Sequence, residues 1–155
     1  MFYSTGKKEG FRIQSFDLHA SLGFLFVNTA FQAKQNLTAL FQKAGFDTTI
    51  DQFVVMGALM GKEGIAQKQI AQICCKNESN LTRILKGMEG KGLIFRQKGR
   101  DARSRSVCLS DTGQTLYFAL APIAESYMTQ ILGELSVEEK AVLAKLIMHI
   151  REKLI

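Results

Sequence analysis

Apolar residues recur at spacings of three and four along most of the chain, which predicts a mainly helical protein. The first such stretch begins near Asp17 and continues to about Lys43, with apolar side chains on more of its circumference than one core can cover. This excess predicts burial against a second copy of the chain. Residues 1–16 mix glycines, charges and scattered aromatics, so we expect a partly ordered lead-in.

Two short amphipathic helices are predicted over residues 67–74 and 77–90, with a tight turn between them. Residues 93–96 and 107–109 then predict two strands, joined by an arginine-rich loop. This order is typical of a winged helix-turn-helix, whose second helix enters the major groove of DNA. We therefore predict a mainly α fold with a small β-hairpin wing.

Capping residues mark the ends of several helices. Thr49 followed by Gln52, and Ser136 followed by Glu139, each form a capping box, while Ser110 can cap a helix that Pro122 is expected to kink. Two further caps are expected at the N-cap Asn77 and at Gly45, which can close the first helix in a left-handed conformation.

The net charge of +6 is concentrated in one segment. Residues 62–105 contain eleven Lys or Arg and four acids, whereas the remainder has nine bases and ten acids. Such a concentration predicts a polyanionic partner, although a solvated basic surface is the alternative.

The helix at 77–90 has two distinct faces. Leu81, Ile84, Leu85 and Met88 fall on one face and are expected to point inward. The opposite face carries hydroxyls, an amide and two bases, which suit base edges and phosphates in a major groove. We predict DNA contacts for Ser79, Asn80, Thr82, Arg83 and Lys86.

The loop between the two strands is too basic to be explained by turn chemistry alone. Asp101 can pair with Arg103 or Arg100 and hold an arginine extended, and a narrow minor groove attracts such a side chain. The predicted wing contacts are Lys98, Arg100, Asp101, Arg103, Ser104 and Arg105.

Several functional classes are disfavoured. The chain has no arrangement typical of an enzyme, no apolar run long enough to span a membrane and no clear export signal, so we expect a cytoplasmic non-enzyme without a cofactor. His19 and His149 lack the clustered ligands of a metal site, and the three cysteines do not have zinc spacing.

Five motifs, taken in order, resemble the MarR family of bacterial winged helix-turn-helix transcriptional regulators. They are TIDQF at 49–53, QKQIA at 67–71, LTRILKGMEGKGLI at 81–94, DARS at 101–104 and LSDTG at 109–113. The resemblance extends from residue 17 to residue 154. Two departures are Ala66, where the family often has Ser or Thr, and the absence of a cysteine near the start of the first helix, where the peroxide-sensing branch has one.

The resemblance implies a homodimer built by the first, fifth and sixth helices. The expected organisation is a dimerisation helix at 17–47, a winged helix-turn-helix DNA-binding domain at 48–110 and two dimerisation helices at 111–155. Two recognition helices related by a two-fold axis would bind a pseudo-palindromic operator on double-stranded DNA. Repression is the commoner mode in the family.

The resemblance also implies a cleft that accepts a small aromatic effector. By position, its candidate lining residues are His19, Phe24, Phe53 and Met56, which packing in the core would equally explain. A rival hypothesis is redox control through Cys74 and Cys75 in the turn, where Lys76 is expected to lower a thiol pKa. A third possibility is a winged helix that binds protein or RNA instead of duplex DNA.

Overall fold

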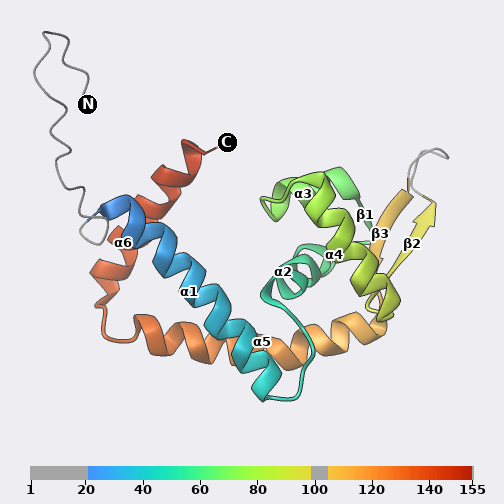
Figure 1. Ribbon diagram of the computed structural model, residues 1–155, viewed down its shortest axis with the longest axis horizontal. Helices are drawn as coiled ribbons and strands as arrows, with labels where there is room; N and C mark the ends of the chain where they lie inside the picture. The colour runs from blue at the N-terminus through green and yellow to red at the C-terminus, as the bar shows by residue number, and fades with distance from the viewer. Residues whose placement is uncertain (1–20, 99–104, 155) are drawn as a thin grey trace, which may run out of the picture. The chain divides into compact units, whose positions relative to one another are not determined.

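The computed structural model describes residues 21–98 and 105–154. Their elements, in chain order, are α1 (Leu22–Lys43), α2 (Ile50–Leu59), β1 (Ile65–Ala66), α3 (Gln67–Ile73), α4 (Glu78–Gly90), β2 (Ile94–Lys98), β3 (Arg105–Leu109), α5 (Asp111–Leu132) and α6 (Val137–Glu152). The protein is thus mainly helical with one small antiparallel sheet, as predicted (Figure 1). The chain divides into two units, Met1–Ala33 and Lys34–Ile155. The predicted lead-in at 1–16 lies outside the described residues.

Local capping explains where most helices begin. The Thr49 and Ser136 hydroxyls accept from the backbone N–H groups of Gln52 and Glu139, whose side chains accept in return, so both predicted capping boxes are confirmed. Ser110 caps α5, which continues through Pro122 to Leu132. At the end of α1, Gly45 has the predicted left-handed conformation, with φ of 89°.

The sheet has the order β1-β3-β2, with both pairs antiparallel. Strands β2 and β3 form the predicted hairpin, in which Lys98 pairs with Arg105 at the end nearest the loop. The two-residue strand β1 was not predicted from the sequence, and it attaches the segment before α3 to the far side of β3. Consequently α3 begins directly at the sheet.

The core of the Lys34–Ile155 unit lies where α2, α4, α5 and the sheet meet. Phe53 of α2 stacks on Tyr117 of α5 with ring centroids 5.0 Å apart, and Phe41 approaches Phe53 edge-on at 5.4 Å. The fully buried side chains of this core include Phe41, Met56, Leu59, Ile70, Leu81, Leu85, Met88 and Leu120. These contacts hold α4 against the rest of its unit.

Helix α6 has no buried residue. Its exposed apolar side chains include Val137 (78% exposed), Leu146 (55%) and Met148 (64%). The second half of α5 adds exposed Met128 and Ile131. Soluble monomers rarely expose so many apolar side chains together. Among the described helices, none is long and apolar enough to cross a membrane.

Candidate nucleic-acid interface

Helix α4 presents the two faces expected from its sequence. The Asn77 side chain caps it by accepting from the backbone N–H of Asn80 at 2.8 Å. Leu81, Leu85 and Met88 are fully buried, and Ile84 is half-buried, so the predicted inward face is confirmed.

The opposite face is largely open to solvent. Ser79, Thr82, Arg83 and Lys86 are exposed, and Asn80 is half-buried. Three of these side chains already form hydrogen bonds within the protein: Arg83 donates to Asn80 at 3.3 Å, and Thr82 accepts from Gln67 at 2.7 Å. Thr82 also donates to the Glu78 carbonyl at 2.7 Å. The face is available to a ligand, and its contacts with DNA stay a prediction.

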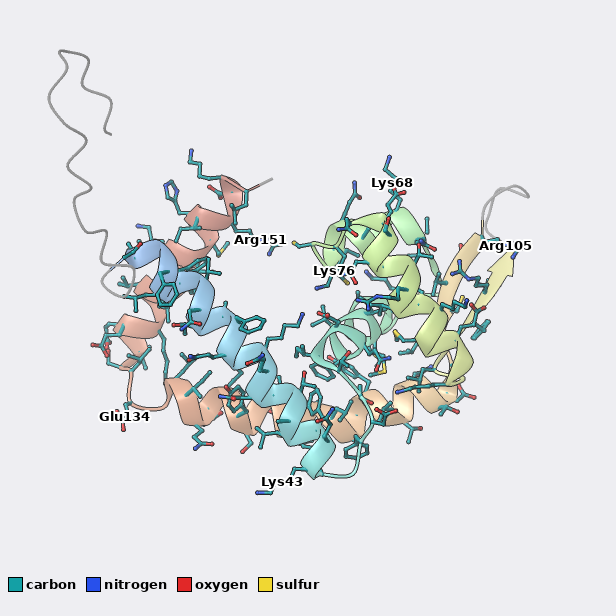
Figure 2. The ribbon with its side chains drawn as sticks, viewed as in Figure 1. Lys43, Lys68, Lys76, Arg105, Glu134 and Arg151 are labelled. Atoms are coloured by element: carbon teal, nitrogen blue, oxygen red, sulfur yellow. The ribbon has the colours of Figure 1, made fainter. Side chains whose placement is uncertain are left out.

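The basic side chains of the central segment fall into two groups. In the first group, Lys76, Lys91 and Arg96 form ion pairs with Asp51, Asp47 and Glu89 respectively. In the second group, the side chains form no ion pair with any acid in the described ranges; its members are Lys62, Lys68, Arg83, Lys86 and Arg105. Figure 2 shows Lys68 extending outward from α3 and Arg105 at the start of β3. The second group is the part of the basic segment that can meet an external anion.

The wing is described only up to its loop. Lys98 ends β2, and the exposed Arg105 begins β3. The remaining predicted wing contacts, Arg100, Asp101, Arg103 and Ser104, lie outside the described residues and stay predictions.

Asp51 forms an ionic centre that the sequence did not reveal. One carboxylate oxygen lies 2.9 Å from the Lys34 ammonium of α1, and the other lies 2.9 Å from that of Lys76, just before α4. Burial alone would raise the pKa of Asp51, but the hydrogen bonds and charges of Lys76 and Lys34 outweigh it and hold the pKa below its usual value. The carboxylate therefore stays charged at neutral pH and joins three segments.

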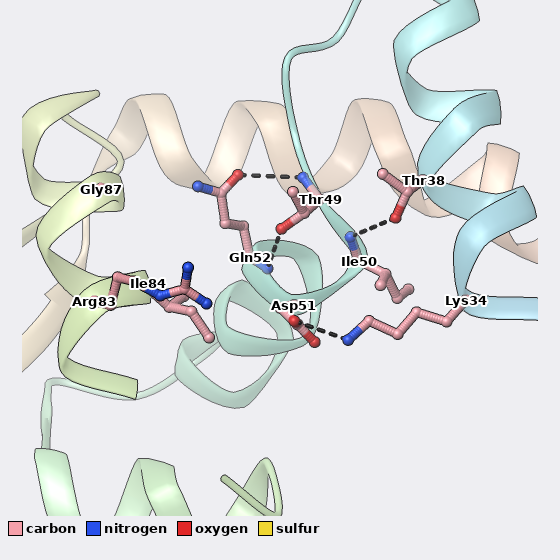
Figure 3. A pocket seen from close by; sticks show the side chains of 9 residues that line it. All are labelled: Lys34, Thr38, Thr49, Ile50, Asp51, Gln52, Arg83, Ile84 and Gly87. Atoms are coloured by element: carbon pink, nitrogen blue, oxygen red, sulfur yellow. Dashed lines mark hydrogen bonds and ion pairs between the residues drawn. The ribbon is translucent and has the colours of Figure 1, made fainter. Parts of the chain in front are cut away.

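A pocket of about 360 Å³ adjoins this ionic centre (Figure 3). Its lining comes from α1, the start of α2 and one face of α4, and consists of Lys34, Thr38, Thr49, Ile50, Asp51, Gln52, Arg83, Ile84 and Gly87. In Figure 3 the Arg83 guanidinium is directed from α4 toward the start of α2. The lining carries two cations and one carboxylate; Lys34 is paired with Asp51, which leaves Arg83 as the lining cation without an acidic partner among the described residues.

The predicted effector residues occupy different positions. Met56 is fully buried in the core, and Phe53 packs between Phe41 and Tyr117. Neither residue lines the pocket beside Asp51. Phe24 is half-buried in the Met1–Ala33 unit, and His19 lies outside the described residues. Their role in effector binding remains a prediction.

The two adjacent cysteines differ in environment. Cys74 is buried and Cys75 is exposed. Burial raises the pKa of the Cys74 thiol, and the Lys76 ammonium lowers it by less. Lys76 therefore does act in the expected direction on Cys74, but burial of the thiol outweighs it and the pKa is raised overall. The described residues contain no cluster of His, Cys, Asp or Glu that could hold a metal ion.

Comparison with known proteins identifies the family. Residues 48–104 match the model of the MarR family. The transcriptional regulator HosA of Escherichia coli O157:H7 is 33% identical over 117 residues, which cover 75% of this chain and 87% of HosA. The chain belongs to the MarR family. This MarR-family protein is therefore a DNA-binding transcriptional regulator and not an enzyme.

Solved structures share the fold of this MarR-family protein. The Staphylococcus aureus MepR–DNA complex superposes with a TM-score of 0.78 at 21% identity, covering 87% of this chain and 97% of MepR. PcaV of Streptomyces coelicolor, in complex with its natural ligand, gives a TM-score of 0.74 at 22% identity over 88% of this chain and 95% of PcaV. The winged-helix fold expected from the sequence is confirmed by these similarities.

Proposed function

We infer that this MarR-family protein is a ligand-responsive repressor that binds a pseudo-palindromic operator as a homodimer. The observation that carries the DNA-binding part is the group of exposed bases without an acidic partner on α4 and at the start of β3. Arg83 and Lys86 on α4 would enter the major groove, while Arg105 and the wing loop would follow the backbone or the minor groove.

The homodimer is supported by the apolar surface of α6 and of the second half of α5. Burial of these side chains against water is favourable, and an identical surface on a second chain would cover them by two-fold symmetry. Sedimentation of the full chain at micromolar concentration should give twice the mass of the chain. A monomer at that concentration would contradict the assignment.

Ligand control is supported by the pocket beside Asp51, because Arg83 belongs both to its lining and to the exposed face of α4. A ligand bound there would compete with DNA for the same guanidinium, or would favour a different placement of α4. PcaV was solved with its natural ligand. For this chain, the unpaired Arg83 guanidinium in the lining favours a small aromatic molecule with a negative charge. A screen of small aromatic acids for release of labelled operator tests this part.

The DNA assignment is tested by removing one charge at a time. An operator is first selected from a random pool of duplexes, and its affinity is then measured for Arg83→Ala and for Lys91→Ala. We expect Arg83→Ala to cost about 1–3 kcal/mol per half-site and to relax sequence preference. Lys91→Ala is the matched control, because its ammonium pairs with Asp47 at 2.7 Å and should contribute little. Equal affinities for both variants would refute the placement of α4.

The same titration, repeated at several salt concentrations, distinguishes DNA binding from docking to another protein. Affinity for duplex DNA falls steeply between low and moderate salt because bound counterions are released. A protein-docking winged helix with few ion pairs would show a shallow dependence. A redox mechanism finds less support, because burial disfavours the thiolate of Cys74.

A further inference from the structure

The side chain of Gln67 connects α4 with the wing strand β2, the two segments to which the proposed function assigns separate DNA contacts. Its Nε2 donates to the Thr82 hydroxyl in the first half of α4 at 2.7 Å, and its Oε1 accepts from Nη1 of Arg96 in β2 at 3.4 Å. Arg96 in turn lies 3.4 Å from the Glu89 carboxylate in the last turn of α4. Polar contacts therefore run from the first half of α4 through Gln67 and β2 to the last turn of α4.

Gln67 lies where the start of α3, the sheet and α4 meet. Gln67 is the first residue of α3 and directly follows β1, which pairs with β3. Arg96 lies in the middle of β2, opposite Val107 and two residues before the wing loop is reached at Lys98. Both partners of Gln67 thus belong to parts that would contact the same DNA half-site, namely α4 and the wing strand.

A carboxamide can serve both partners in this way. Its nitrogen donates while its oxygen accepts, whereas a carboxylate can only accept and an ammonium can only donate. Arg96 is basic, but it forms an ion pair with Glu89 and a hydrogen bond with Gln67, so its charge is compensated within the protein. Gln67 itself is half-buried, and its contact with Arg96 is partly shielded from water, whereas its contact with Thr82 is exposed.

We propose that Gln67 is a positioning residue that couples the wing to α4, so that both reach one half-site in the same register. The proposal rests on the DNA-binding role of α4 and the wing. It assigns to Gln67 an effect on sequence discrimination, exerted through Thr82 and Arg96 instead of through a contact of its own with DNA. Misalignment of α4 weakens base contacts, while flexible phosphate contacts adapt.

The variant that tests this is Gln67→Met, which keeps the length of the side chain and removes both hydrogen bonds. Gln72→Met is the matched control, because Gln72 lies on the same helix and is exposed. We expect Gln67→Met to reduce the ratio of operator to non-specific affinity about three- to tenfold, the range that corresponds to one or two lost hydrogen bonds. Non-specific affinity and its salt dependence should match those of the control.

A double-mutant cycle separates positioning from direct contact. If Gln67 acts through Thr82, then Gln67→Met combined with Thr82→Val should lose little more discrimination than Thr82→Val alone. If the two losses multiply, or if non-specific affinity falls by the same factor, Gln67 contacts DNA itself and the proposal is overturned.

A measurement without DNA distinguishes failure of this proposal from failure of the proposed function. Thr82→Val should shift the backbone amide resonances of β2 in the chain that retains Gln67, and should leave them unchanged in the Gln67→Met background. Shifts of equal size in both backgrounds would overturn the coupling even if the protein binds its operator. Normal coupling in a chain that discriminates no duplex sequence would instead overturn the proposed function.

Discussion

The turn between α3 and α4 contains a cysteine in a conformation that glycine adopts more easily. Cys75 has φ of 50°, and the backbone around it forms the paired bonds of a helix C-cap: Lys76 N–H donates to the Ala71 carbonyl at 2.9 Å, and Cys75 N–H donates to that of Gln72 at 3.3 Å. Replacement of Cys75 by glycine should therefore stabilise the protein.

The size of the effect follows from two opposing terms. A side chain in the left-handed region costs about 1–2 kcal/mol, which glycine would recover. Glycine also gains freedom in the unfolded chain, which costs about 0.5–1 kcal/mol. The thiol is exposed, and its Sγ lies 3.9 Å from the Gln72 carbonyl, so its removal has little effect. We expect a net gain of about 0.5–1 kcal/mol in the free energy of unfolding.

Chemical denaturation in the presence of a reductant, at one fixed protein concentration, measures this gain. Cys75→Ala is the control, because it removes the thiol and keeps the Cβ atom, and it should leave stability within about 0.5 kcal/mol of the original. If the glycine variant is no more stable than the alanine variant, the backbone at this turn is not strained. Operator affinity of the original chain and of Cys75→Ala, before and after peroxide treatment, then tests redox control through Cys75, which requires that only the original chain respond.

Two further predictions concern stability. A Cβ atom at Gly113 would collide with the Leu93 carbonyl oxygen, so Gly113→Ala should cost about 2–3 kcal/mol in urea denaturation, whereas Gly90→Ala, which meets no atom within 4 Å, should be neutral or stabilising. Asp51→Asn should cost about 1–2 kcal/mol at pH 7 by loosening its two lysine partners. Because the folded-state pKa of Asp51 is lowered, that stabilisation is present in full above about pH 4 and is lost as the pH falls through the folded-state pKa, so the difference between the variant and the original should shrink steadily below pH 4; a constant difference would contradict the ionic role.

Features governed by neighbouring residues were predictable from the sequence. The caps at Thr49, Asn77, Ser110 and Ser136 each depend on a residue three positions away, and the structure has all four. The inward face of α4 followed from helical spacing in the same way. These local features were sufficient to predict the order of helices and strands in the winged helix.

Features governed by distant residues were not predictable. Strand β1 has only two residues, too few for an alternating pattern, and it exists because β3 offers a free edge. Asp51 meets Lys34 and Lys76 from separate segments, and neither spacing carries a recognisable pattern. For the same reason Arg96 appeared to be part of the external basic surface, although Glu89 and Gln67 engage it.

Because of the close approach at Gly113, a tilt of α5 is transmitted to the backbone that leads into β2. The first turn of this helix lies close against the backbone that leads into β2, because Gly113 has no side chain to hold them apart. Its 22 residues span about 33 Å, so a tilt of about 5° at the end that carries Met128 and Ile131 displaces the opposite end by about 3 Å. A displacement of that size approaches the spacing of one base pair.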